Sequence, residues 1–173
     1  MVSTTSDPQA APDGLESVRE LLNTWLIPND TGVPTDRFDT YRRRRRLRPS
    51  NAATLRELRD DLRTVVEGST GGDEVLTGWI DRLGVTPVVD HARLRFRHEA
   101  KPAGDALVLV LDAITAGSWP RLKACPNCRW VFYDHSRSAT KRWCLMNAAG
   151  PDGRGCGNIT KARRHRARQR AAS

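Results

Sequence analysis

Residues 125–128 read Cys-Pro-Asn-Cys, and this tetrapeptide decides how the C-terminal third of the chain folds. Two thiols spaced in this way lie on one tight turn and can bind the same metal ion. Two more cysteines follow, after gaps of fifteen and eleven residues, and the sequence has no others. Because four thiolates close the tetrahedral shell of a structural Zn²⁺ ion, the spacing predicts one structural zinc site. The predicted ligands are Cys125, Cys128, Cys144 and Cys156.

Other uses of these cysteines fit the sequence less well. Disulfide bonds need an oxidising compartment, but residues 1–13 lack the basic and apolar regions of a secretory signal, so we expect a cytoplasmic protein. A thioredoxin-like redox pair usually opens a helix after a strand, whereas residues 129–133 have the pattern of a strand. His135 and His165 are spare candidate ligands, but four thiolates already complete the shell.

The positive charge of the chain is concentrated in the same region. Residues 121–173 contain 13 Lys and Arg against 2 Asp and Glu, a net charge of +11. The preceding 120 residues have 16 basic and 18 acidic residues, a net charge of −2. Such an asymmetry is typical of a globular body that carries a polyanion-binding segment. No apolar run approaches the roughly 20 residues that span a bilayer, so we expect no membrane partner.

Helical periodicity and turn signals organise the rest of the chain. The predicted elements are, in order, a mobile leader over residues 1–12, helices over 13–27, 50–67 and 73–83, a β-pair formed by 85–89 and 93–97, and a buried helix over 103–116. In the second strand of the pair, Leu94 and Phe96 alternate with arginines, which is the pattern of a half-buried strand. The apolar run 106–111 is by itself compatible with a strand, but the length of the pattern around it favours a helix.

These elements predict an α+β fold in two parts joined by a hinge at residues 117–120. Residues 13–118 form a mostly helical N-terminal domain with a short β-pair. Residues 121–173 form a small treble-clef or zinc-ribbon-like finger that ends in a basic helix. The finger has too few large apolar side chains to fold about 50 residues unaided, so we expect zinc to supply much of its stability.

Three segments of the finger, residues 125–137, 141–146 and 156–165, closely resemble the CGNR zinc-finger family. The preceding residues, including Leu22-Asn23-Thr24 and the stretch 55–59, resemble the ABATE domain that usually precedes this finger. Proteins of this architecture are described as bacterial, stress-induced transcription regulators. The resemblance therefore implies DNA binding in the bacterial cytosol or nucleoid, with residues 13–118 as a sensor or dimerisation domain.

The sequence departs from that family in two places. Ile159 stands where the signature arginine of the Cys-Gly-Asn-Arg motif is expected, so any contact made by that arginine in relatives is in doubt here. The segment between Cys144 and Cys156 is also longer than the usual spacer. This insertion indicates that the loop has diverged while the ligand set has not.

The tail after Cys156 predicts a helix with cations all round and no apolar stripe. At 100° per residue, its basic side chains divide between two opposite faces. Lys161, Arg164 and Arg168 share one face, and Arg163, Arg166 and Arg170 share the other. Four residues of the finger, Arg129, Arg137, Lys141 and Arg142, extend this basic surface. Duplex DNA is the favoured partner, because such a helix can contact the phosphates of both strands in a groove.

The sequence thus favours a zinc-dependent, DNA-binding transcription regulator. An RNA-binding or non-specific nucleic-acid accessory protein is the alternative, because Trp130 and Trp143 can stack on unpaired bases. Both tryptophans adjoin zinc ligands, so covering the zinc core is the simpler interpretation of them. A solvated tail that binds any polyanion is a further alternative.

We do not expect an enzyme. The chain has no Gly-rich phosphate loop and no nucleophile elbow. In the N-terminal domain, a histidine stands next to a carboxylate only at Asp90-His91 and His98-Glu99, beside the ends of the predicted strands, where exposed polar residues are usual.

The N-terminal domain can instead bind a small-molecule effector or form a homodimer. Trp25, Trp79 and Trp119 are candidate pocket residues, although their spacing is also typical of a core. The run Arg42–Arg46 is expected on a loop as solvated charge, with a phosphate-contacting arm as the alternative.

Overall fold

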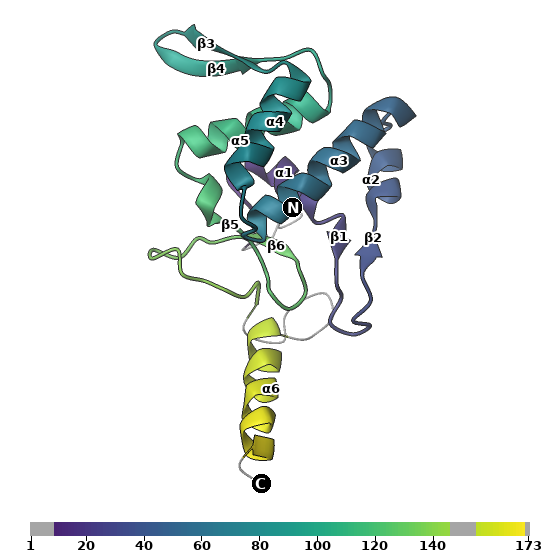
Figure 1. The fold of residues 1–173 in the computed structure, drawn as a ribbon, viewed down its shortest axis with the longest axis vertical. Helices are drawn as coiled ribbons and strands as arrows, with labels where there is room; N and C mark the ends of the chain where they lie inside the picture. The colour runs from purple at the N-terminus through teal and green to yellow at the C-terminus, as the bar shows by residue number, and fades with distance from the viewer. Residues whose placement is uncertain (1–8, 146–154, 172–173) are drawn as a thin grey trace, which may run out of the picture.

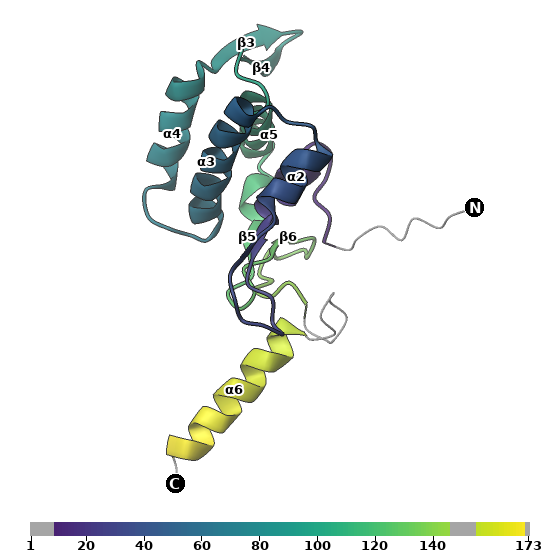
Figure 2. The same ribbon diagram turned by 90° about the vertical axis from the view of Figure 1, so that its right-hand side faces the viewer.

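The computed structural model describes residues 9–145 and 155–171 (Figure 1). Helices and short antiparallel strand pairs form a body, and a C-terminal helix extends from it as a separate rod (Figures 1 and 2). The elements are α1 (Leu15–Leu22), β1 (Trp25–Leu26), β2 (Thr35–Asp36), α2 (Phe38–Arg44), α3 (Pro49–Val66), α4 (Gly72–Leu83), β3 (Thr86–Asp90), β4 (Arg93–Arg97), α5 (Ala103–Thr115), the short 3-10 helix η1 (Trp119–Arg121), β5 (Leu122–Ala124), β6 (Val131–Tyr133) and α6 (Cys156–Ala171). Among the described residues, no helix is both long and apolar enough to cross a membrane.

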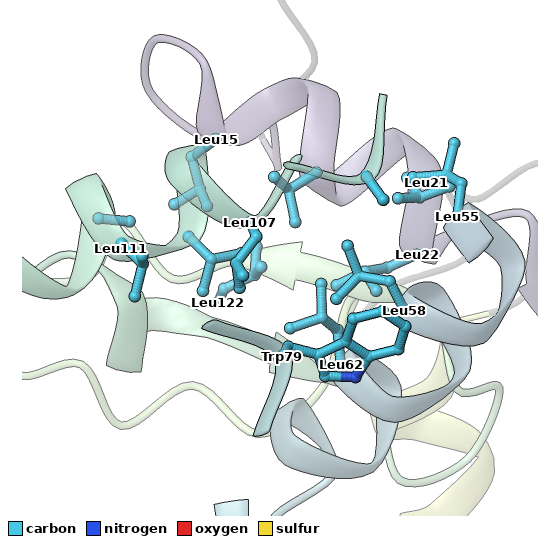
Figure 3. Close-up of a cluster of buried hydrophobic side chains, with 14 of the residues drawn as sticks. Leu15, Leu21, Leu22, Leu55, Leu58, Leu62, Trp79, Leu107, Leu111 and Leu122 are labelled. Atoms are coloured by element: carbon cyan, nitrogen blue, oxygen red, sulfur yellow. The ribbon is translucent and has the colours of Figure 1, made fainter. Parts of the chain in front are cut away.

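The hydrophobic core lies between α1, α3, α4 and α5 (Figure 3). Leu22, Leu58 and Leu107 have no exposed surface, and they come from three different helices. The β5–β6 hairpin closes this core, because Leu122 and Val131 belong to the same buried cluster. The first part of the finger is therefore anchored on the body.

Most of the predicted regular elements are confirmed. The helices predicted over 50–67 and 73–83 are α3 and α4, and the predicted buried helix over 103–116 is α5. Glycines in the left-handed region follow α3 and α4, with φ of +84° at Gly68 and +61° at Gly84, which is a common way for a helix to end. The β-pair is β3–β4, with Val89 opposite Leu94.

The first helix is shorter than predicted, because it ends at Leu22 and does not continue to residue 27. The side chain of Asn23 exchanges two hydrogen bonds with Val131, donating 2.8 Å to its carbonyl and accepting 2.7 Å from its amide. These bonds hold the chain against β6 at the point where the helix ends. Trp25 and Leu26 then form β1, which pairs with β2.

The segment between the helices predicted over 13–27 and 50–67 contains β2 and α2, neither of which the sequence predicted. The carboxylate of Asp36 accepts a 2.8 Å hydrogen bond from the amide of Phe38 at the start of this helix. Phe38 is 1% exposed and packs in the core. The expectation that Arg42–Arg46 lies on a loop is wrong for its first three residues, which form the last turn of α2.

Two further expectations differ from the structure. The mobile leader does not extend to residue 12, because Gln9 and Ala11 are buried; the leader's residues 1–8 lie outside the described residues. The second strand of the β-pair is less buried than its alternation indicated, with Leu94 49% exposed. The hairpin β3–β4 projects from the body at the end opposite α6 (Figure 1), where little of the chain covers it.

Candidate metal centre and basic helix

The Cys-Pro-Asn-Cys turn connects the two strands β5 and β6. The amide of Cys125 donates a 2.9 Å hydrogen bond to the carbonyl of Trp130, and the amide of Arg129 donates 2.8 Å to the carbonyl of Cys125. Arg129 itself has a φ of +60°, which lets the chain reverse within this short turn. The hairpin therefore fixes the first two cysteines relative to the body core.

The four predicted cysteine ligands converge on one point. Their sulfur atoms all lie within 4.8 Å of one another. The Sγ atoms of Cys128 and Cys144 are 3.6 Å apart, as are those of Cys144 and Cys156. A tetrahedral zinc ion with Zn–S bonds of about 2.3 Å holds its thiolates about 3.8 Å apart, whereas a disulfide needs about 2.05 Å. The arrangement therefore fits one zinc ion and excludes disulfides between these sulfur atoms.

The thiols also need a cation to be ionised together. Hydrogen bonds from Cys128 and the other two thiols lower the pKa of Cys125 strongly. Hydrogen bonding to Cys125 raises the pKa of Cys128 and of Cys144 far above the usual range, since these neighbours cannot all carry a negative charge in one buried cluster. A bound divalent metal reverses this preference, because it deprotonates the thiols that coordinate it. All four side chains are buried, as expected for a closed structural site.

The spare histidines do not join the cluster. His135 is exposed, and its Nε2 lies 2.7 Å from the carbonyl oxygen of Ala10. His165 is exposed on α6. Within residues 9–145 and 155–171, the candidate metal-binding group consists of the cysteines alone.

A loop of the N-terminal body completes the surroundings of the metal site, which the sequence did not indicate. The side-chain amide of Asn29, between β1 and β2, donates a 3.1 Å hydrogen bond to the sulfur of Cys156. Asn127, within the cysteine turn, donates 2.5 Å to the side-chain oxygen of Asn29. Arg163 on α6 donates 3.0 Å to the side-chain oxygen of Asn127. The body, the cysteine turn and the basic helix therefore meet around one zinc ligand.

A buried carboxylate organises the loop after β6. Asp134 has no exposed surface and accepts hydrogen bonds from the Lys123 ammonium (2.8 Å), the Ser136 amide (2.9 Å) and the Lys141 amide (2.8 Å). Burial by itself raises the pKa of Asp134, but these hydrogen bonds outweigh it and hold the pKa well below the usual range. The side chain therefore stays charged and positions the segment that leads to Cys144.

The helix α6 begins at Cys156, one of the four candidate zinc ligands, and extends away from the body (Figures 1 and 2). Every residue from 161 to 170 is exposed, and the helix contains no acidic residue. One of the two predicted basic faces lies beside Trp143, where Lys161, Arg164 and Arg168 line a shared groove with its indole. Arg163, on the other face, reaches back to Asn127.

The basic residues predicted in the finger lie in different surroundings. Arg137 is exposed, the Lys141 ammonium lies 5.4 Å from the ring centre of Phe132, and the Arg142 guanidinium lies 6.0 Å from that of Trp143. Arg129 is paired with an acidic residue of the N-terminal body, and its side chain is 40% exposed. Its guanidinium lies 3.3 Å from the carboxylate of Glu67, directly after α3.

The tryptophans considered as pocket residues are used in packing. Trp79 is buried in the core, and its indole N–H donates a 2.8 Å hydrogen bond to Asp61. The guanidinium of Arg63 covers the ring of Trp25 at 4.5 Å, and Trp119 packs against the core. Trp130 and Trp143 pack against the cysteine cluster, as predicted.

Residues 121–169 match the family model of the CGNR zinc finger. This segment contains all four clustered cysteines and most of α6, so it forms a zinc-finger domain with one candidate zinc site. No match was found among curated proteins or among solved structures. The family match begins at Arg121, and the ABATE-like character of the preceding residues stays a prediction.

Proposed function

We propose that this zinc-finger protein is a transcription regulator of the bacterial cytosol that binds duplex DNA through α6 and senses a ligand or partner through residues 13–118. The observation that supports the proposal most directly is the exposure of α6. Within residues 161–170, six side chains are Lys or Arg, none is acidic, and all are exposed. We further propose that the protein acts by binding and not by catalysis.

The shape of α6 suits the groove of a duplex. A helix of sixteen residues is about 24 Å long, and the major groove of B-DNA, about 12 Å wide, admits an α-helix. Because α6 carries cations on both faces, one face can contact the phosphates of one strand while the other contacts the second strand. Each neutralised phosphate releases counterions, and this release drives binding.

Zinc gives the helix its direction. Cys156 is both a ligand of the candidate site and the first residue of α6, so a bound metal would hold the base of the helix against the cysteine turn. The hydrogen bond from Arg163 to Asn127 adds a second contact with the cysteine turn, about two helical turns further along α6. Zinc would therefore present the basic residues from a rigid base, and binding would depend on the metal.

An RNA-binding or single-strand-binding accessory protein is the second candidate, and the groove beside Trp143 favours it. An indole next to three cationic side chains is the combination on which unpaired bases stack while their phosphates are neutralised. Duplex DNA remains the first candidate. A single strand bound in the groove beside Trp143 would leave the opposite basic face of α6 without a phosphate to contact.

Fluorescence anisotropy with a labelled duplex, the corresponding single strand and a structured RNA separates these functions. The zinc-loaded protein should bind the duplex most tightly, with a logarithmic affinity that falls linearly with the logarithm of salt concentration, by a slope of about −0.9 per phosphate contacted. Replacing Lys161, Arg164 and Arg168 by Gln should weaken binding and flatten the slope, and so should replacing the opposite face. Preference for single strands would move the accessory role to first place, and no binding to any of the three would refute the proposal.

A further inference from the structure

A shallow recess lies where α1, α2 and the zinc finger meet, away from the four cysteines. Its walls include Arg19 and Glu20 of α1, Tyr41 and Arg44 of α2, and Trp130 of the finger. Arg37, just before α2, completes the rim. The recess is thus built from both parts of the protein, and an occupant would touch the body and the finger at once.

The charge around this recess is positive. Three arginines line it against one carboxylate, that of Glu20. The carboxylate of Glu20 already forms a 2.8 Å ion pair with Arg45, which does not line the recess. Arg19 forms a 2.7 Å ion pair with Glu16, which also lies outside the recess. The carboxylates near the recess are therefore taken up largely by other contacts.

Two guanidinium groups remain available for a ligand. Arg44 is 68% exposed, and its ion pair to Glu20 is long, at 3.8 Å. Arg37 is exposed and makes no ion pair or side-chain hydrogen bond within the described part of the chain. Two arginines on one concave surface match the fork geometry by which guanidinium groups bind carboxylates and phosphates.

Aromatic and hydroxyl groups complete the chemistry of the recess. Trp130 lines the recess, and the Arg19 guanidinium lies 6.0 Å from the centre of its ring. Burial raises the pKa of Tyr41, so its phenol keeps its proton and can donate a hydrogen bond. The walls therefore combine cations and a hydrogen-bond donor with the flat surface of an indole.

We propose that this recess binds a small organic anion, in which Arg37 and Arg44 hold a carboxylate or phosphate and Trp130 covers a flat group joined to it. The inference rests on the proposed role of residues 13–118 as a sensor and gives that sensor a site. It differs from the expectation that Trp25, Trp79 and Trp119 line the pocket, because those side chains are used in packing. An anion in this recess would bridge α2 and the finger, and so would connect ligand binding to the domain that carries α6.

Titration calorimetry on the zinc-loaded full-length protein tests the site without nucleic acid. The probes are benzoate and phenyl phosphate, with inorganic phosphate as the anion lacking a ring and benzamide as the neutral analogue of benzoate. We expect saturable one-to-one binding of at least one aromatic anion and none of benzamide. Arg37→Gln and Arg44→Gln should each weaken that binding about tenfold or more, as for other hydrogen bonds to charged groups. Arg48→Gln is the matched control, since Arg48 is exposed and does not line the recess.

The contribution of the ring is measured separately. Trp130→Leu should weaken the binding of the aromatic anion more than the binding of inorganic phosphate, provided that the variant retains its zinc. Failure of both aromatic anions to saturate, or binding that survives both arginine substitutions, would overturn the proposal. A loss of DNA affinity in the arginine variants without any anion binding would also overturn it, because the recess would then contact nucleic-acid phosphates. Because the calorimetry contains no nucleic acid, its failure leaves the DNA-binding proposal standing.

Discussion

The side chain of Asn29 donates a 3.1 Å hydrogen bond to the sulfur of Cys156 across 127 positions of the chain. A candidate zinc ligand in the finger is thus supported by a loop of the N-terminal body. Hydrogen bonds to ligand atoms fix the position of the ligand and moderate the charge on its sulfur. The candidate zinc site is therefore not a property of the finger alone.

Asn29→Ala should weaken zinc binding, because it removes this donor without touching a ligand. Loss of an outer-shell partner typically reduces metal affinity by about 10- to 100-fold, and we expect a value in this range. Competition with a chromophoric chelator measures the affinity directly. Val33→Ala is the control, because Val33 lies in the same loop with its side chain 60% exposed. Equal zinc affinities of the two variants would show that the Asn29 contact is structurally incidental.

Removal of zinc should unfold the finger unevenly. Under reducing conditions a chelator should abolish amide protection around Cys128 and Cys144, because structural zinc supplies on the order of 10–16 kcal/mol in small modules of this kind. The helices α1, α3 and α5 should keep their protection. Strands β5 and β6 should lose theirs only in part, since Leu122 and Val131 belong to the body core. Hydrogen exchange with mass spectrometry distinguishes these segments, and unchanged protection of the cysteine turn would count decisively against a metal.

The sequence predicts those parts of this molecule in which the signal is local. Leu55, Leu58 and Leu62 repeat at helical spacing before Gly68, and α3 has the expected extent within about two residues. The number and spacing of the four cysteines likewise predict a metal site, and their sulfur atoms lie together in the structure. Neither inference depends on knowing what lies across the fold.

The features that the sequence did not reveal depend on distant partners. The first helix ends at Leu22 because Asn23 pairs with Val131, 108 positions away. Asn29, in a stretch of turn-forming residues, looks like an ordinary loop residue until Cys156 is placed beside it. The sequence contains a weak signal for α2. Asp36 lies two residues before Phe38, where its carboxylate can cap a helix, and Phe38 and Tyr41 are three residues apart, as on one helical face. The run of arginines that follows obscures this apolar pattern.

The buried Arg59 should be among the most sensitive positions of the body. It is 1% exposed and forms two 2.9 Å hydrogen bonds to the carboxylate of Asp36, which lowers the pKa of Asp36 and ties β2 to α3. Arg59→Met should reduce the free energy of unfolding by about 3 kcal/mol, near the lower end for a broken buried pair, because Asp36 keeps some solvent. Urea denaturation followed by circular dichroism measures the change.

Arg56→Met provides the comparison for Arg59 on the same helix. Its guanidinium pairs at 3.2 Å with Asp39, whose side chain is 64% exposed. Such surface pairs contribute about 0–1 kcal/mol. If the two variants were equally stable, the Arg59–Asp36 pair would not have the role that its burial indicates.

The buried carboxylate of Asp134 sets a pH dependence whose direction follows from its lowered pKa. Its pKa in the folded state lies below the value of 3.8 expected for the unfolded chain. The group therefore contributes stability that is fully present above pH 3.8 and is lost as the pH falls through the lower folded value. Asp134→Asn should be less stable than the original protein by a constant amount between pH 7 and pH 5, and denaturant titrations at several pH values measure this difference. A difference that shrinks already at pH 5 would contradict the prediction.

Trp143 provides a test of which nucleic acid the finger prefers. Its indole lines a groove with Lys161, Arg164 and Arg168, where an unpaired base can stack while its phosphate meets a cation. Stacking of one base on an aromatic side chain is worth about 1–3 kcal/mol, so Trp143→Ala should lower single-strand affinity by roughly 5- to 150-fold. Binding to a duplex, whose bases are already stacked on one another, should change far less. Anisotropy titrations of the two labelled nucleic acids at one salt concentration give both values.

Trp143 packs against the cysteine cluster, so a substitution there can also weaken zinc binding. The zinc content of each variant must therefore be measured together with its affinity. Trp143→Phe keeps an aromatic face and should retain most of the single-strand affinity, whereas Trp143→Ala should not. Both variants must bind one zinc ion each, since a lost metal would weaken every nucleic acid alike. If Trp143→Ala retained zinc and weakened duplex and single strand equally, the indole would serve only to cover the metal core. The basic faces of α6 would then account for nucleic-acid binding by charge alone.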